Sequence, residues 1–132
     1  ELLTTVTEAI QYKGMVPYDK SVEAIKDYYA LLFPTYWKGE GFPGTIVDAF
    51  SAGLPVIATD WNCNSEIVDD GINGILYPNE EIKTLKRAIE FLMSDEKLVE
   101  MMKKNCIKSA NRFQPDKYIK DIISRIEIEK NK

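Results

Sequence analysis

The chain has 132 residues, 45% hydrophobic and 29% charged, which is the composition of one folded globular domain and excludes a disordered chain. Its formal net charge of −4 argues against a nucleic-acid partner, because a surface that binds the phosphate backbone needs clustered Lys and Arg. The absence of histidine excludes histidine-based triads and histidine-ligated metals, and Cys63 and Cys106 lack metal-type spacing, so we expect two reduced thiols and no metal.

Short apolar runs alternate with helical segments through the first half of the sequence. Predicted strands cover Ile10–Gly14, Ala30–Phe33, Pro55–Thr59 and Gly74–Tyr77. Predicted helices run from Asp19 or Ser21 to Tyr29 and over Thr45–Ala52, after which Gly53 can take the left-handed conformation that ends a helix. The third strand is nearly all apolar, as is typical of a strand buried on both faces. This alternation with short connections predicts an α/β fold with a parallel sheet covered by helices.

The last third of the sequence is helical. Apolar residues at helical spacing predict helices over Glu80–Met93, capped by Asn79, and over Asp95–Ala110, capped by Ser94. A further helix opens at Pro115 and carries one apolar stripe over residues 118–126. We interpret these stripes as surfaces that pack on the core. The sequence thus predicts a single domain over residues 1–132 whose C-terminal part, residues 80–130, is helical.

The segment from Trp37 to Asp60 contains the candidate binding site. It predicts a strand end, a loop with three glycines and a proline, and then the start of a helix. In an open α/β sheet, ligands bind in the crevice at the carboxyl ends of the strands. The amides of Gly44, Thr45 and Ile46 would begin the helix and suit a phosphate, because the helix dipole adds about half a positive charge there.

Two carboxylates flank these amides, Glu40 before them and Asp48 in the first turns of the helix. Carboxylates beside a phosphate site are favourable where they accept hydrogen bonds from hydroxyl groups, which sugars supply. The combination indicates a nucleotide-sugar site. The residues alone leave a second interpretation open, in which the loop is only a connection and Asp48 is an ordinary acid on a helix surface.

The sequence also resembles a known family along these residues. The matching runs are EGFPGTIVDAFSAGLPVIATD over Glu40–Asp60 and SEIVDDGINGIL over Ser65–Leu76. Between about Ile10 and Phe113 the chain resembles the C-terminal, donor-binding domain of retaining glycosyltransferases of family 4. These enzymes have the GT-B fold of two facing Rossmann-like domains. The resemblance implies a Rossmann-like sheet without its first strand, and an acceptor domain that this chain lacks.

The resemblance also implies roles for individual residues. Glu40, the candidate catalytic residue, would hold hydroxyls of the donor sugar, and Asp48 would hold the ribose, although it is one methylene shorter than the family's usual glutamate. Backbone amides expected on the sugar and diphosphate are those of Phe42, Gly44 and Thr45, and the residues expected to line the nucleobase are Met15 and Val16. Glu66 matches a recurrent acid whose expected role is to tie the loop over residues 61–66 to neighbouring backbone.

The function implied for the whole protein is transfer of a glycosyl group from a nucleoside-diphosphate sugar, without a metal or other cofactor and with retention of configuration. The family often builds cell-surface polysaccharide in the cytoplasm, so peripheral association with the inner face of the membrane is a further expectation. Because catalysis depends on closing the two domains around the substrates, we expect the fragment alone to be inactive. The family's Arg and Lys that neutralise the diphosphate would precede this region, so we also expect weaker binding of the donor.

Other functions compatible with the sequence are a GT-B sugar-nucleotide epimerase, a glycogen-synthase-like enzyme and a non-catalytic α/β regulatory module. The regulatory module fits poorly, because Asp69 and Asp70 lie in a turn before a strand. The chain could also act as an interaction domain through the stripe over residues 118–126.

Overall fold

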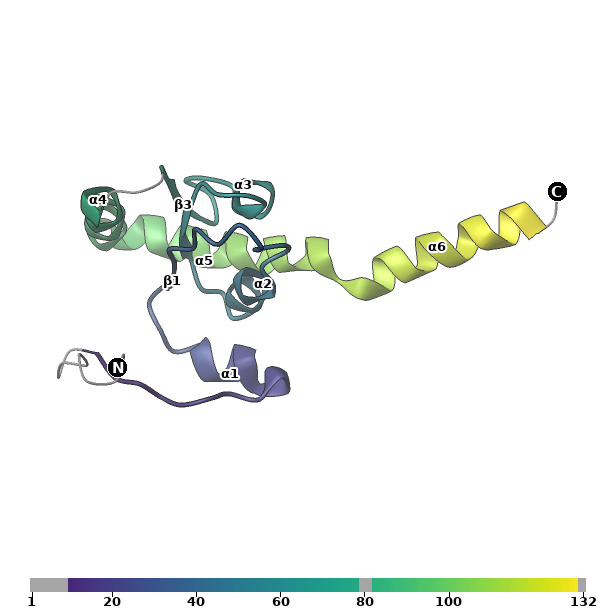
Figure 1. Ribbon diagram of the computed structural model, residues 1–132, viewed down its shortest axis with the longest axis horizontal. Helices are drawn as coiled ribbons and strands as arrows, with labels where there is room; N and C mark the ends of the chain where they lie inside the picture. Colours follow the sequence, from purple (N-terminus) through teal and green to yellow (C-terminus); the bar gives the residue numbers. More distant parts are fainter. Residues whose placement is uncertain (1–9, 79–81, 131–132) are drawn as a thin grey trace.

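A three-stranded parallel sheet forms the centre of the molecule (Figure 1). The structure, a computed structural model, describes residues 10–78 and 82–130. The strands are β1 (Leu31–Phe33), β2 (Val56–Thr59) and β3 (Gly74–Tyr77), in the order β1-β2-β3. Leu31 lies opposite Val56, and Ile57 lies opposite Ile75. This arrangement confirms the predicted α/β fold with a parallel sheet.

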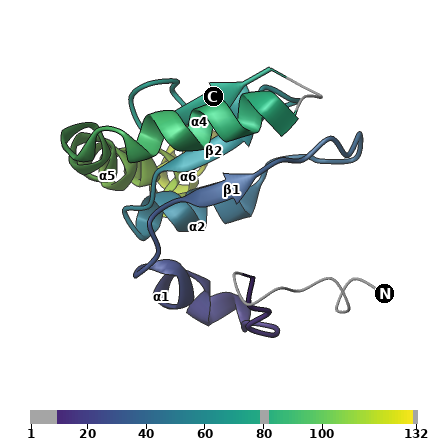
Figure 2. The ribbon, with the colours of Figure 1, turned by 90° about the vertical axis from the view of Figure 1, so that its left-hand side faces the viewer.

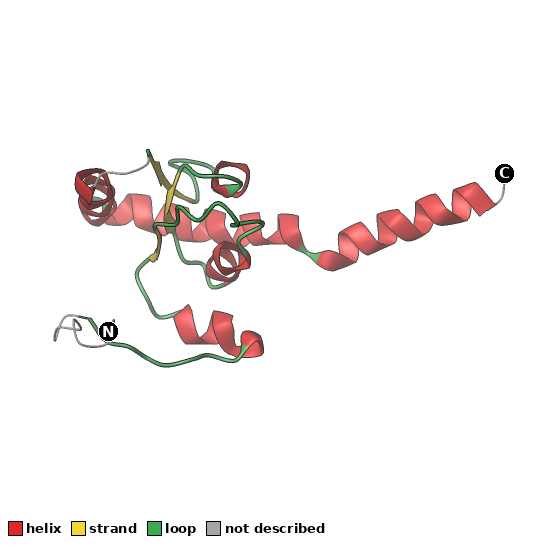
Figure 3. Ribbon diagram, viewed as in Figure 1, coloured by secondary structure: helices red, strands yellow, loops and turns green. Residues whose placement is uncertain are grey.

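Helices cover both faces of the sheet, as Figures 2 and 3 show. The helices are α1 (Ser21–Ile25), α2 (Gly44–Ser51), α3 (Asn64–Ile67), α4 (Ile82–Met93), α5 (Glu96–Ala110) and α6 (Pro115–Lys130), with 3-10 turns η2 (Tyr18–Lys20) and η3 (Asn111–Phe113). The core follows the strand period of two, because successive side chains of β2 point to opposite faces. Val56 and Ala58 pack with α2, whereas Ile57 packs in a second cluster with residues of α4.

Strand β2 and helix α5 join the two halves of the core. All four residues of β2 are buried, as the nearly continuous apolar run predicted. Helix α5 contributes Met102 to the cluster beneath α4 and Cys106 to the cluster beneath α2. Helix α2 ends as predicted: Gly53 has a φ of 70°, and the amide of Leu54 donates to the carbonyl of Ala49.

The N-terminal elements differ from the prediction. The strand predicted over Ile10–Gly14 is wrong: these residues form an irregular arm beside α1 on which Ile10 and Tyr12 are exposed. The described residues offer this segment no neighbouring strand, and a strand without a partner leaves its amides and carbonyls unpaired. The helix predicted to reach Tyr29 ends at Ile25, and the amide of Tyr28 donates to the Ile25 carbonyl in the turn that follows.

The C-terminal helices form as predicted, with two corrections. The cap of α5 is Asp95 and not Ser94: the Asp95 carboxylate accepts hydrogen bonds from the amides of Lys97 and Leu98. Helix α4 begins at Ile82 in the described part, and the predicted cap Asn79 lies outside the described residues.

Helix α6 projects away from the sheet in Figures 1 and 3. The apolar stripe over residues 118–126 was predicted to pack on the core, but its side chains are about half exposed. The physical reason is that the helix leaves the domain at the turn before Pro115 (Figure 1), so that only Tyr118, at the start of the stripe, lies near residues of α2 among those that the structure describes. The predicted packing of this stripe on the chain's own core is therefore wrong.

The turn between α3 and β3 has little room at Gly74. A Cβ atom at this position would overlap the carbonyl oxygen of Val56 and lie 2.9 Å from a side-chain carbon of Val68. Beside it, the buried side chain of Asn73 accepts from the amide of Asp69 and donates to the hydroxyl of Ser109. Glycine at position 74 thus allows β3 to lie close to β2, and Asn73 ties the turn to α5.

Gly74→Ala should lower the free energy of unfolding by about 1–3 kcal/mol, because β3 must move away from the Val56 carbonyl. Thermal unfolding followed by circular dichroism measures the effect. Gly41→Ala is the control, since a Cβ at Gly41 meets no atom within 4 Å and that glycine has no positive φ. Equal stability of the two variants would contradict the close approach at Gly74.

The two cysteines should differ in reactivity towards a thiol reagent in the native protein. Both are free, as predicted; Cys63 is partly exposed and Cys106 is buried. Burial raises the pKa of the Cys106 thiol to about 12, so almost no thiolate forms near neutral pH. We expect Cys63→Ser to abolish labelling and Cys106→Ser to leave it unchanged, as measured by mass spectrometry, whereas full labelling of native Cys106 would contradict its burial.

Candidate functional site

The candidate site lies where the chain leaves the carboxyl ends of β1 and β2. Because neighbouring parallel strands end at the same edge of the sheet, the loops after them are adjacent. The loop over residues 34–43 connects β1 to α2, and residues 60–63 connect β2 to α3. In Figure 2 the first of these loops extends beyond the arrowhead of β1.

The two loops are joined at the carbonyl oxygen of Trp37. It accepts hydrogen bonds from the Glu40 amide at 3.1 Å and from the Trp61 indole nitrogen Nε1 at 3.1 Å. The Asn62 side-chain nitrogen Nδ2 lies 3.5 Å from the same oxygen and donates to the Glu40 carbonyl at 3.2 Å. Asn62 adopts a φ of 47°, which an L-residue rarely does and which asparagine tolerates better than most. The second loop therefore fixes the path of the first around Glu40.

The carboxylate of Glu40 is held by a short chain of hydrogen bonds from the sheet. The hydroxyl of Thr35 donates to Glu40 Oε2 at 3.0 Å, and the carbonyl of Thr35 accepts from the hydroxyl of Thr59 at 2.7 Å. Thr59 is the last residue of β2 and is fully buried. The buried end of β2 thus positions the half-buried carboxylate of Glu40 through Thr35.

The first turn of α2 presents two amides, one fewer than the sequence predicted. The amide of Ile46 donates to the carbonyl of Pro43 at 3.0 Å, so the prediction that it would be free is wrong. The reason is that the helix begins at Gly44, one residue earlier than expected. Among the described residues, no acceptor faces the amides of Gly44 and Thr45. These amides and the helix dipole remain available to an anion.

A hollow of about 490 Å³ opens beside this helix end. It is lined by Phe42, Gly44, Val47, Asp48, Phe113 and Tyr118. Three of the sequence-predicted residues, Phe42, Gly44 and Asp48, are thereby brought together. The rings of Phe42 and Phe113 meet edge to face at 5.5 Å between centroids.

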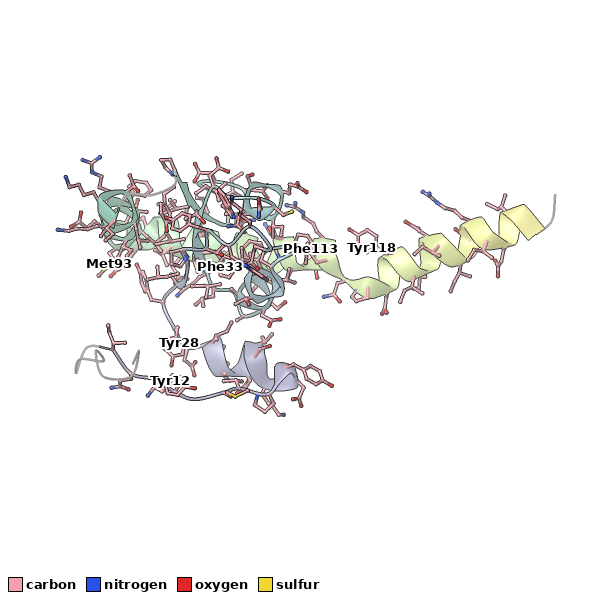
Figure 4. All side chains as sticks on the ribbon, viewed as in Figure 1. Tyr12, Tyr28, Phe33, Met93, Phe113 and Tyr118 are labelled. Carbon is pink, nitrogen blue, oxygen red and sulfur yellow. The ribbon has the colours of Figure 1, made fainter. Side chains whose placement is uncertain are left out.

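Phe113 and Tyr118 were not among the residues predicted for the site. Figure 4 shows both at the junction between α5 and α6, and the Tyr118 hydroxyl donates to the carbonyl of Arg112 at 2.6 Å. Their signal in the sequence is weak, because they are aromatic residues on either side of the helix break at Pro115, more than sixty positions after Asp48. Only the fold shows that this junction returns to the start of α2.

Met15 and Val16 lie on the irregular arm before α1. Their side chains are 94% and 46% exposed, and neither lines the hollow. Figures 1 and 2 both show the arm beside α1, away from the sheet. A contact between these residues and a nucleobase stays a prediction.

Glu66 does not tie its loop through its carboxylate. That side chain is exposed and has no hydrogen bond or ion pair within the part of the chain that the structure describes. The backbone carbonyl of Glu66 accepts instead from the guanidinium of Arg112, which also pairs with Asp69 at 2.7 Å. Other side chains fix this loop. The Asn64 side chain donates to the carbonyl of Thr59 at 2.9 Å, and Trp61 and Asn62 make the hydrogen bonds to the first loop described above.

Residues 10–78 and 82–130 contain no cluster of three or more Cys, Asp or Glu side chains arranged to hold a metal ion. None of the helices in these ranges combines the length and the hydropathy that crossing a membrane requires.

Several known proteins are similar to this chain in sequence. The chain is 35% identical over 83 residues to an exopolysaccharide phosphotransferase of Streptomyces coelicolor, an alignment that covers 62% of this chain and 9% of that protein. It is 33% identical over 75 residues to UDP-Gal:alpha-D-GlcNAc-diphosphoundecaprenol alpha-1,3-galactosyltransferase of Escherichia coli, with 57% and 19% of the two proteins covered. The chain therefore spans only a small part of the length of these relatives.

A solved structure agrees on the fold. Sucrose-phosphate synthase from Thermosynechococcus elongatus superposes with a TM-score of 0.61 at 20% identity, over 74% of this chain and 24% of that one. This likeness confirms the Rossmann-like α/β arrangement. Residues 4–109 match the family described as glycosyl transferases group 1. Because that match takes in most of the sequence, the chain belongs to the glycosyl transferases group 1 family.

Proposed function

We propose that this chain binds the nucleoside-diphosphate sugar donor of a glycosyltransferase of family 4, as its C-terminal, donor-binding domain. The observation that supports this proposal is the hollow at the start of α2, where Phe42, Gly44 and Asp48 line one concave surface. A nucleoside diphosphate offers phosphates, ribose hydroxyls and an aromatic base. The hollow offers an amide-bearing helix end for the phosphates and a carboxylate for the ribose hydroxyls, and its aromatic rings add apolar surface.

In the proposed complex the amides of Phe42, Gly44 and Thr45 bind the sugar and the diphosphate. Asp48 accepts hydrogen bonds from the ribose. The base lies against Met15 and Val16, whose apolar side chains are uncovered among the described residues. Helix α2 has no acidic side chain in its first turn that would repel a phosphate.

Glu40 binds the donor sugar in this proposal. A carboxylate has about four acceptor positions, and the Thr35 hydroxyl occupies one of them. The remaining positions can accept two vicinal hydroxyls, and the fixed Thr35 contact sets the orientation of the group. Glu40 thus acts by orienting the sugar, while protein dipoles stabilise the leaving diphosphate.

For the whole protein we propose a metal-independent, retaining hexosyl transfer that requires an N-terminal acceptor domain, in the cytoplasm or at the inner face of the membrane. A role in cell-surface polysaccharide synthesis is supported by two relatives, an exopolysaccharide phosphotransferase and a galactosyltransferase that uses UDP-Gal. A sugar-nucleotide epimerase or a glycogen-synthase-like enzyme would use the same donor site. Product analysis with a labelled donor distinguishes them, because an epimerase releases an altered sugar without an acceptor.

Glu40→Ala in the full-length protein should reduce glycosyl transfer by about a hundredfold or more, because the donor sugar loses its orienting acceptor. Isothermal titration with UDP-, GDP- and ADP-sugars measures donor binding, and a transfer assay measures glycosyl transfer. Glu66→Ala is the matched control, an exposed carboxylate near the same loops without a partner in the described chain, and it should retain activity. Absence of binding by the wild-type protein to every donor tested, with or without magnesium, would refute the proposed function.

Asp48→Ala should weaken binding of the free nucleoside diphosphate by about tenfold, since the loss of a hydrogen bond between a carboxylate and a hydroxyl costs roughly 1.5 kcal/mol. Asp48→Glu should bind at least as tightly as the wild-type chain, because one more methylene extends the carboxylate towards the ribose. Calorimetric titration with UDP against its 2′,3′-dideoxy analogue isolates this contact. The assignment fails if the Ala variant loses equal affinity for both ligands.

A further inference from the structure

The loop before Glu40 presents an exposed indole that is held in one place. Trp37 is 69% exposed, although exposing the apolar surface of an indole to water costs free energy. Its six-membered ring lies against the backbone of Gly39: a Cβ there would be 2.7 Å from Cζ2 and 3.1 Å from Cη2. Glycine at position 39 therefore allows the ring to lie close over its own loop.

The backbone of Trp37 is also fixed, because its carbonyl accepts from Trp61 Nε1 and its amide lies 3.4 Å from the Thr35 hydroxyl. An exposed side chain on a fixed backbone has already lost part of the conformational entropy that binding would cost. Such preorganisation favours ligand contact. The exposed face of the fixed indole can therefore stack on the flat apolar face of a ligand, which would remove that face from water.

Two more aromatic rings lie on the loops after β1 and β2. The indole of Trp61 comes from the loop after β2, and the ring of Tyr36 meets it edge to face, with centroids 6.4 Å apart. Tyr36 and Trp37 are exposed, and Trp61 is half-buried. We call Tyr36, Trp37 and Trp61 the aromatic shelf.

Polar groups lie on the same two loops as the shelf. The Glu40 carboxylate is bound by Thr35, and the Asn62 amide donates to the carbonyls of Trp37 and Glu40. A sugar ring has an apolar face of C–H groups and a rim of hydroxyls. Aromatic rings beside hydrogen-bonding side chains match both features, whereas a purely apolar partner would leave the Glu40 carboxylate desolvated without a hydroxyl to bind.

We infer that the aromatic shelf binds the sugar ring of the glycosyl acceptor, an inference that rests on the proposed donor site. The residues proposed for the donor follow Glu40 in the chain, and the hollow that they line includes no residue of the shelf. The shelf comes from the residues before Glu40 and from the loop after β2. Glu40 lies between the two sets of residues in the chain, and in the complex that we infer a ring stacked on Trp37 lies next to the sugar that Glu40 orients.

Saturation-transfer NMR on the full-length protein tests this inference. The probes are the methyl glycosides of glucose, galactose and N-acetylglucosamine, with UDP as a separate probe of the donor site. We expect saturation of the ring C–H protons of at least one glycoside by the wild-type protein. Trp37→Ala should raise the Kd of that glycoside by about five- to tenfold, the loss of one aromatic contact, and leave the Kd of UDP unchanged. Trp37→Phe should restore most of the affinity, and Gly39→Ala should weaken it by displacing the indole.

Phe91→Ala is the matched control, since Phe91 is an exposed aromatic residue on α4, and it should bind the glycoside like the wild type. The inference is overturned if no glycoside is saturated, if Trp37→Ala keeps full affinity, or if it loses UDP binding to the same extent, which would assign Trp37 to the donor. A protein that binds the glycoside at Trp37 but binds no nucleotide or nucleotide sugar would instead refute the proposed function while the stacking contact stands.

Discussion

The burial of β2 is the constraint on which the rest of the structure depends. Its four residues have almost no contact with solvent, and both of its edges are paired, to β1 and to β3. A strand in this position must be apolar on both faces, and its neighbours must supply complementary surfaces, which α2 and α4 do. Because the sheet is parallel, the same pairing brings the loops after β1 and β2 to one edge. The site is therefore a consequence of how the core is closed.

Hydrogen bonds to the Trp37 carbonyl fix the loop after β1, in which few side chains are buried. Residues 36–39 and 41–42 are exposed, so hydrophobic burial does not fix them. The hydrogen bonds from the Glu40 amide, Trp61 and Asn62 replace burial, and Asn62 adopts an uncommon backbone conformation to provide its share. Thr59 and Thr35 add a second connection, which runs from the buried end of β2 to the Glu40 carboxylate. Hydrogen bonds thus hold the loop at Glu40, whose side chain is only half-buried.

The sequence predicted correctly those elements whose structure depends on residues close together in the chain. The apolar run of β2 and the glycine at the end of α2 specify their structures within a few residues, and both were confirmed. The strand predicted over Ile10–Gly14 failed because a strand exists only with a neighbour, which a short apolar run cannot report. The shelf and the contribution of Phe113 were missed for a related reason. They depend on loops and helix junctions far apart in sequence, and on an asparagine side chain whose acceptors only the fold reveals.

The charges around α2 set a condition on the proposed donor. The segment from Trp37 to Asp60 contains one basic residue, Lys38, beside the carboxylates of Glu40, Asp48 and Asp60. Arg112, near the hollow through its neighbour Phe113, already pairs with Asp69 at 2.7 Å. A helix end supplies only about half a positive charge, which is less than a diphosphate requires. We therefore expect the cations that neutralise the diphosphate to come from outside the described site, so that amides and carboxylates here select the shape of the donor while other residues supply most of its electrostatic binding energy.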